Sequence, residues 1–164
     1  MLKDISHKNF EELLEDVKGN RIRTYILFSN KGLGKTTYMK NLSINFENTE
    51  YIDFLDVSED FFKTQNIIEL KYFQIELFFK YLKKKYGISN KFILLDNIDY
   101  LFTTLKPSEI KNFFDKFKTQ VYKNGLMIAL SNIRALSIEK SLLESSFPSS
   151  NIIKLGGELI NGKN

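Results

Sequence analysis

Short apolar runs rich in β-branched and aromatic residues alternate with segments of helical periodicity along most of this chain. That alternation predicts an α/β fold, in which a parallel sheet is covered by helices. Each run is short, as strands buried inside such a sheet usually are. The predicted strands are Thr24–Phe28, Tyr51–Leu55, Phe92–Leu95, Leu126–Leu130 and Asn151–Leu155.

Helical periodicity predicts five helices before and between these strands. They are expected at Asn9–Val17, Lys35–Phe46, Gln65–Tyr86, Ser137–Ser145 and from Pro107 or Ser108 to Tyr122. The long middle helix spaces its apolar residues close to a 3.6-residue period, so it should supply a face of the core, and its aromatic residues are interpreted as structural. That face consists of Ile67, Ile68, Leu70, Phe73, Leu77, Phe78, Tyr81 and Leu82.

The length of 164 residues predicts a single domain spanning residues 1–164. The sequence shows neither a long apolar window of membrane-spanning length nor the apolar core of a signal peptide. We therefore expect a cytoplasmic protein that does not contact a membrane. The lack of cysteine excludes disulfides and cysteine metal sites, so a bound metal must rely on oxygen ligands.

The basic residues give a formal net charge of +4, which raises the question of nucleic acid binding. Lysine supplies 21 of the 24 basic residues, and the lysines are spread along the chain. The tightest cluster, residues 83–85, falls at an expected helix end, where cations suit the helix dipole. These features favour the drift of an A+T-rich genome over a dedicated nucleic acid surface.

A glycine-rich segment with a lysine follows the first predicted strand and precedes a predicted helix. It matches G-x-x-x-x-G-K-[ST] except at the first position, where serine replaces glycine. The glycines allow backbone amides to turn toward an anion, and the helix start adds a positive end. A glycine-rich surface turn with an incidental lysine is the alternative. The residues predicted to bind ATP or ADP are Ser29, Asn30, Lys31, Gly32, Leu33, Gly34, Lys35, Thr36 and Thr37.

Lys35 should reach the β- and γ-phosphates, and the Thr36 hydroxyl should ligate Mg²⁺. The third predicted strand ends in Asp96, which is expected to lie beside the same ion as a Walker B aspartate. The next residue, Asn97, can hydrogen-bond a water but cannot accept its proton, so slow or no hydrolysis is expected. Asp99 is an alternative base, although a role in capping the local turn is favoured.

The fourth predicted strand ends in the polar pair Ser131 and Asn132. Such a pair fits a sensor that hydrogen-bonds the γ-phosphate or the attacking water. Asn132 is the preferred candidate and Ser131 the second. A plain strand-terminating turn is the alternative interpretation.

The segment Phe92-Ile-Leu-Leu-Asp-Asn-Ile-Asp-Tyr-Leu101 resembles the Walker B segment of the DnaA family of AAA+ proteins, in the variant of its Hda branch. Residues 113–117, 123–132 and 142–155 are similar to the helix, sensor strand and last core strand of that family. The resemblance covers residues 10–159 and implies a three-layer P-loop NTPase core. Its five-stranded parallel sheet would have the order 5-1-4-3-2, and its role would lie in DNA replication initiation or its regulation.

The chain departs from the family pattern in several places. Ser146 stands where the family has its arginine finger, which argues against activating a partner's hydrolysis by the usual route. The sequence also shows no helical lid, clamp-binding peptide or DNA-binding domain of the family. Arg21 and Arg23 flank the first strand and are expected to be solvated, although one could act as an unconventional finger.

Three functions remain open at the level of sequence. The preferred one is a DnaA/Hda-like nucleotide-binding protein with weak ATPase activity at most, which pairs with a DnaA-like protein or with itself. A helicase-loader or partition-type ATPase acting directly on DNA is the second. The third is a non-hydrolysing protein-interaction module that the nucleotide stabilises.

Overall fold

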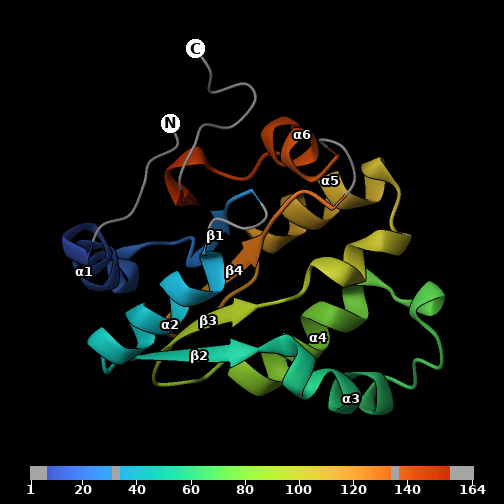
Figure 1. The fold of residues 1–164 in the computed structure, drawn as a ribbon, viewed down its shortest axis with the longest axis horizontal. Coiled ribbons are helices and arrows are strands. Elements are labelled where there is room, and N and C mark those ends of the chain that lie inside the picture. The colour runs from blue at the N-terminus through green and yellow to red at the C-terminus, as the bar shows by residue number, and fades with distance from the viewer. Residues whose placement is uncertain (1–6, 31–33, 134–136, 156–164) are drawn as a thin grey trace.

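The protein is built around a five-stranded sheet in which all neighbouring strands run parallel (Figure 1). The computed structural model describes residues 7–30, 34–133 and 137–155. The order β2-β3-β4-β1-β5 confirms the predicted α/β class and the predicted strand order. The strands are β1 (Thr24–Phe28), β2 (Thr49–Asp53), β3 (Phe92–Asp96), β4 (Leu126–Leu130) and β5 (Ile152–Lys154).

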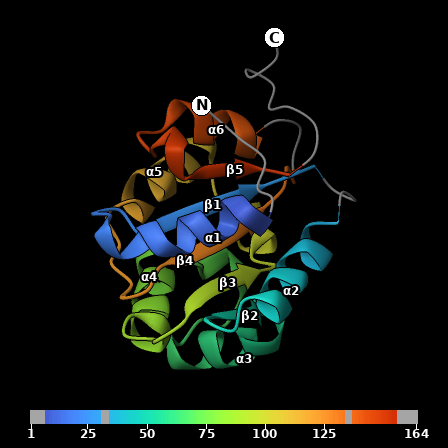
Figure 2. The same ribbon diagram turned by 90° about the vertical axis from the view of Figure 1, so that its left-hand side faces the viewer.

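Helices cover both faces of the sheet (Figures 1 and 2). The α-helices are α1 (His7–Asp16), α2 (Lys35–Asn45), α3 (Phe54–Thr64), α4 (Ile75–Tyr86), α5 (Pro107–Phe117) and α6 (Ser137–Glu144). Short 3-10 turns are η1 (Val17–Gly19), η2 (Leu70–Tyr72), η3 (Asp99–Thr104) and η4 (Ser149–Asn151). None of the helices in the described part of the chain is long and apolar enough to cross a membrane.

Alternate residues of each central strand belong to two separate hydrophobic clusters, as the period of two in a strand requires. Tyr25 and Leu27 of β1 pack with α1 and α2. Ile26 and Phe28 pack with the helices of the other face, from α3 to α6. All five residues of β1, β3 and β4 are buried, which explains why their sequences are continuous apolar runs.

Aromatic rings fill most of the cluster between the sheet and helices α3 to α5. Phe113 of α5 lies 4.8 Å from Phe102 and 5.1 Å from Phe79, measured between ring centroids. Phe61 and Tyr81 lie 5.2 Å apart at the junction of α3 and α4. Rings at these distances add edge and stacking attraction to the burial of their area. The structural role predicted for the aromatic residues of the middle segment is confirmed by the burial of Phe73, Phe78 and Tyr81.

The second strand lies two residues earlier than the predicted Tyr51–Leu55. It ends at Asp53, whose Oδ1 accepts a hydrogen bond of 3.0 Å from the Leu55 amide and caps α3. The prediction missed α3 because the apolar pair Phe54-Leu55 was assigned to the strand. An aspartate followed by a helical pattern is a helix-start signal that outweighs two apolar residues.

The single helix predicted over Gln65–Tyr86 is wrong. Asn66 has a φ of 57°, in the left-handed region, so the chain leaves α3 there and resumes a helix at Ile75. Ile68, predicted to face the core, is 85% exposed. Ile67 and Phe73 are nevertheless buried, because the intervening loop folds back against the core. Apolar spacing alone could not distinguish this loop from a helix.

The remaining helices and strands differ from the predicted ones only in where they begin or end. Helix α5 stops at Phe117 rather than Tyr122, yet the Tyr122 ring is fully buried in the connector to β4. Strand β3 extends one residue further than predicted and therefore includes Asp96. Strand β5 is shorter than the predicted Asn151–Leu155.

Gly125 allows the close packing of the connector that enters β4. Its φ is 96°, and a Cβ at this position would lie 2.8 Å from the Phe92 ring and 3.0 Å from the Val17 side chain. Gly19 in η1 has nothing within 4 Å of the corresponding position. The two glycines therefore form a matched pair for testing backbone strain and packing.

We predict that Gly125→Ala lowers the free energy of unfolding by about 2–4 kcal/mol, through the positive φ and the clash with Phe92. Gly19→Ala should change it by less than about 0.5 kcal/mol. Urea unfolding followed by circular dichroism measures both. Equal midpoints for the two variants would contradict the packing described here.

Candidate functional site

The polar residues singled out in the sequence follow the carboxyl ends of β1, β3 and β4, which are neighbours in the sheet. Parallel strands end at the same edge, so Ser29, Asp96 and Ser131 come together there although they are distant in sequence. All three are buried. In open α/β sheets this edge is where ligands bind.

Helix α2 begins at this edge with Gly34 as its N-cap, at φ 78° and ψ 26°. A glycine has no side chain with which to cap the first-turn amides of Lys35, Thr36 and Thr37. The first helical hydrogen bond runs from the Tyr38 amide to the Gly34 carbonyl at 2.8 Å. The helix start thus presents N–H groups and the positive end of its dipole to an anion. Lys31, Gly32 and Leu33 of the predicted loop lie outside the described residues, and Asn30 precedes them as an exposed residue.

The Lys35 ammonium group lies between β4 and η3. It donates a hydrogen bond of 3.1 Å to Ser131 Oγ and lies 4.0 Å from Asp99 Oδ2. The side chains of Lys35 and Asp99 are only 15% and 20% exposed. The predicted phosphate lysine is therefore held at the sheet edge by two of the residues that the sequence singled out.

Asp96 is fully buried and accepts three hydrogen bonds. Its Oδ2 accepts from the Thr36 hydroxyl at 2.6 Å and from the Tyr51 hydroxyl at 2.9 Å, and its Oδ1 accepts from the Asn97 amide at 2.8 Å. Burial and the hydrogen bond to Asp96 raise the pKa of Tyr51, so Tyr51 remains a donor at neutral pH. Both oxygens of the buried carboxylate therefore have hydrogen-bond partners.

The donor set around Asp96 fits Mg²⁺. A carboxylate and a hydroxyl 2.6 Å apart are hard oxygen ligands, and Mg²⁺ typically takes one or two carboxylates together with phosphate and water. The described residues contain no cluster of three or more His, Cys, Asp or Glu that would form an all-protein metal cage. Ser29 Oγ is buried without a hydrogen-bond partner, which leaves a polar atom for a ligand at the loop entrance.

Asn97 adopts a left-handed conformation with a φ of 62°. Its Nδ2 donates to Asp53 Oδ1 at 2.9 Å, so Asp53 binds both the amide of Asn97 and the first turn of α3. This bond fixes the orientation of the amide and directs its carbonyl oxygen away from Asp53. Asn97 can thus accept a hydrogen bond from a water but has no means of taking up a proton.

Ser131 and Asn132, the polar pair after β4, contact different parts of the molecule. Ser131 accepts from Lys35, whereas Asn132 Oδ1 accepts a hydrogen bond of 3.0 Å from the Glu139 amide near the start of α6. In this conformation the second-ranked Ser131, rather than Asn132, contacts the phosphate lysine. Asp99 is the first residue of η3, which starts without a side-chain cap at Ile98, and its carboxylate lies near Lys35. Its proposed role in capping the turn stays a prediction.

Arg23, considered as a possible arginine finger, has structural partners instead. The guanidinium of Arg23 donates to the backbone carbonyls of Lys18, Asn20 and Lys123, so it is not simply solvated. Arg21 is exposed at the same end of β1, far from Ser29 at the other end of that strand. Arg134 lies outside the described residues.

Ser146, the position aligned with the finger, is bound to α5. Its amide and its hydroxyl both donate to Asp115 Oδ1 at 2.7 Å. These bonds, together with the nearby Lys111, lower the pKa of Asp115 to about 2. Ser146 therefore anchors the end of α6 to the core helices.

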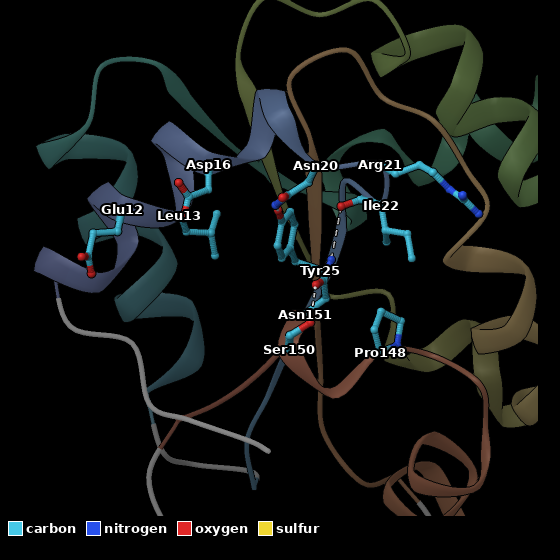
Figure 3. Close-up of a pocket in the computed structure, with 10 residues that line it drawn as sticks. All are labelled: Glu12, Leu13, Asp16, Asn20, Arg21, Ile22, Tyr25, Pro148, Ser150 and Asn151. Atoms are coloured by element: carbon cyan, nitrogen blue, oxygen red, sulfur yellow. Dashed lines mark hydrogen bonds between the residues drawn. The ribbon is translucent and has the colours of Figure 1, made fainter.

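A cavity of about 600 Å³ lies at the opposite edge of the sheet, where β1 begins (Figure 3). Glu12 and Asp16 of α1 line one side, and Pro148, Ser150 and Asn151 line another. Asn151 Nδ2 donates to the Thr24 carbonyl at 2.9 Å and joins η4 to β1. The cavity shares no residue with the cluster around Asp96.

Sequence reasoning missed Tyr51 and Asp53 as members of the site. Both were assigned to a strand without a role, but the register pairs Asp53 with Asp96 across β2 and β3. Tyr51 lies two residues before Asp53, on the same strand, and reaches Asp96. Polar residues at the end of the strand beside a Walker B segment are the signal that could have identified them.

No protein-family model matches the sequence, and no curated protein matches it. Among solved structures, the chain is similar to PCH-2 of Caenorhabditis elegans, at 13% identity and a TM-score of 0.43. It is also similar to the ORC1 protein of Aeropyrum pernix in complex with DNA, at 13% identity and a TM-score of 0.40. The matches cover 92% and 95% of this chain but only 41% and 45% of those proteins, so the chain spans less than half of either.

We predict that Asp115→Asn destabilises the protein by about 1 kcal/mol at pH 7, because two hydrogen bonds to a partly exposed carboxylate lose their charge. Since the pKa of Asp115 is lowered on folding, its contribution is complete above about pH 4 and disappears as the pH falls toward 2. Urea unfolding should therefore give a difference in free energy of unfolding between wild type and variant that becomes smaller from pH 5 to pH 2. A difference in free energy of unfolding that does not change with pH would contradict this prediction. The control is Glu11→Gln, a substitution at an exposed position on α1.

Proposed function

We propose that the chain binds ATP or ADP with Mg²⁺ at the carboxyl edge of the sheet and belongs to the DnaA/Hda-like AAA+ proteins. The observation that supports this most is the convergence of Thr36 and Asp96, 60 residues apart, at 2.6 Å beside the start of α2. A P-loop match becomes informative when a strand precedes it, a helix follows it and a buried carboxylate faces it. All three conditions are met among the described residues.

Each part of the site has a role in holding the nucleotide. The first-turn amides of α2 bind the phosphate oxygens, and Lys35 leaves Ser131 and Asp99 to neutralise the β- and γ-phosphates. Thr36 and Asp96 hold the metal, with Tyr51 orienting Asp96 from the neighbouring strand. Bound Mg²⁺ supplies positive charge that screens the phosphates during transfer.

Hydrolysis is proposed to be slow. A water held by Asn97 has no proton acceptor in that residue. Ser146 offers no positive charge to a neighbouring subunit. The protein would then act as a nucleotide-dependent binding partner of a DnaA-like protein or of itself in replication control.

Mixing the protein with a DnaA-like protein of the same cell tests the pairing. Cross-linking and ATP turnover of the mixture should differ from the sum of the separate proteins, and the difference should require the bound nucleotide. If nucleotide binds but the mixture behaves as the sum, the DnaA/Hda-like role fails while the nucleotide site stands. Turnover by the isolated protein at ordinary ATPase rates would exclude the non-hydrolysing form of the proposal.

Lys35→Ala should raise the Kd for Mg-ATP by about 100-fold, because charge-assisted bonds to phosphate are worth about 1.5–3 kcal/mol. Asp96→Asn should retain nucleotide binding but lose most of the gain that Mg²⁺ gives. Calorimetry with and without Mg²⁺ measures both, and Lys63→Ala on the distant α3 is the control. Unchanged affinity in Lys35→Ala would remove the phosphate role of the loop.

Exchanging Asp53 and Asn97 tests whether the lack of a carboxylate at position 97 makes hydrolysis slow. The double variant Asp53→Asn with Asn97→Asp keeps the hydrogen bond, the side-chain volumes and a good helix cap, but moves the carboxylate to the Walker B segment. We expect its ATP turnover to rise about tenfold or more over wild type. Asn97→Asp alone should gain less, because two facing carboxylates repel and retain a proton. An unchanged rate in the double variant would show that Asn97 does not limit hydrolysis.

A further inference from the structure

Three connectors that enter the sheet at its amino-terminal edge lie against one another. They are residues 17–23 before β1, which include η1, residues 83–91 before β3, which include the last turn of α4, and residues 118–125 before β4. The Lys123 amide donates to the Gly87 carbonyl at 2.8 Å, and the Leu126 amide donates to the Arg23 carbonyl at 3.0 Å. The Arg23 guanidinium joins the first connector to the third through the Lys123 carbonyl. Together the three connectors form one surface, here called the amino-edge surface.

The amino-edge surface concentrates positive charge that looks scattered in the sequence. Its three connectors carry nine of the 24 basic residues and none of the 20 acidic ones. The rest of the chain then holds 15 basic against 20 acidic residues and is net negative. The basic residues are Lys18, Arg21, Arg23, Lys83, Lys84, Lys85, Lys91, Lys118 and Lys123.

Most of this charge faces solvent and is not neutralised within the protein. Lys18, Lys84 and Lys91 are exposed, and none forms an ion pair in the described part of the chain. Lys85 is the exception, with Asp60 Oδ2 at 3.2 Å. Acidic side chains border the surface: Glu12 and Asp16 line a cavity with Arg21, and Asp60 interacts electrostatically with Lys84 as well as Lys85. The unpaired lysines still repel one another, and a ligand of opposite charge relieves that repulsion.

We propose that the amino-edge surface binds the phosphate backbone of nucleic acid. Lysines on separate connectors present point charges along an irregular edge, which suits a row of phosphates better than a single small anion. Amide side chains lie among them: Asn90 Oδ1 accepts from Lys123 Nζ at 3.1 Å, and Asn124 Nδ2 donates to the Ser89 carbonyl at 2.7 Å. Lysine, asparagine and serine are typical donors to phosphate and sugar.

Two other anionic partners fit this surface less well. Protein interfaces are depleted in lysine at their centres and rely on buried aromatic or apolar anchors. A membrane-bound surface needs a continuous apolar face next to its cations. The large exposed apolar side chains of this surface are Ile88 and Val121, two residues among nine basic ones, so they do not amount to such a face.

The amino-edge surface lies across the sheet from the nucleotide loop. Figure 2 shows the three connectors along the left of the sheet, whereas the start of α2 lies at the right. Each β-strand separates its connector from the site residue at its other end, as β1 separates Arg23 from Ser29. Nucleic acid bound here leaves the nucleotide site open, so the two ligands should not compete.

Fluorescence anisotropy with a labelled 30-base-pair DNA duplex, repeated with a single strand of the same length, tests the proposal on the whole protein. The test variant is Lys18→Gln with Lys84→Gln and Lys91→Gln, since no side-chain hydrogen bond or ion pair is lost among the described residues. The matched control is Lys63→Gln with Lys71→Gln and Lys140→Gln, which removes the same charge from exposed positions on α3, η2 and α6. Circular dichroism confirms that both triple variants are folded.

Wild type should bind at low salt, with log K falling steeply as log salt rises. The test variant should bind at least tenfold more weakly with a salt slope reduced by about 2–3, and the control variant should stay within about threefold of wild type. Mg-ATP added at constant ionic strength should leave the affinity unchanged, which separates this surface from the nucleotide site. The proposal is overturned by no binding at 50 mM salt, by equal losses in the two triple variants, or by competition from Mg-ATP. Binding to poly-glutamate or phosphatidylserine vesicles without binding to DNA would also overturn it.

Discussion

The burial of the Asp96 carboxylate under three hydrogen-bond donors is the constraint on which the candidate site depends. A buried carboxylate is costly unless its charge is compensated, and here the donors come from α2, β2 and the backbone after β3. This arrangement requires β3 to lie between β2 and β4, with β1 beyond β4. The strand order and the start of α2 therefore both determine which donors reach Asp96 at this edge of the sheet.

The central strands were predictable from their apolar runs, and the starts of the helices after β1 and before β4 were predictable from the glycine-lysine motif and from Pro107. Strands β1 and β4 match the predicted residues at both ends. The region from Phe54 to Phe73 was not predictable, because its buried apolar residues lie on a short helix and a loop rather than on one long helix. The spacing of apolar residues indicates which residues are buried. It does not show where a residue in the left-handed region, such as Asn66, interrupts a helix.

The motif residues of the site could be named from sequence, but their contacts could not. Nothing in the sequence indicated that Tyr51 would donate to Asp96, or that Asp53 would hold Asn97, since both contacts depend on the register between β2 and β3. The scatter of lysines likewise concealed their convergence, because three connectors distant in the sequence meet only when the parallel strands align. Charge along a sequence is therefore a poor guide to charge on a surface.

Asp53 links two parts of the molecule through one atom, since its Oδ1 accepts from both the Leu55 amide and the Asn97 side chain. Turning the Asn97 amide would leave this oxygen with the helix start alone, and unwinding the first turn of α3 would free the amide to rotate. A change at either element therefore alters the hydrogen bonding of the shared oxygen. Asp53 thus couples the backbone after β3 to the start of α3 at this rim of the sheet.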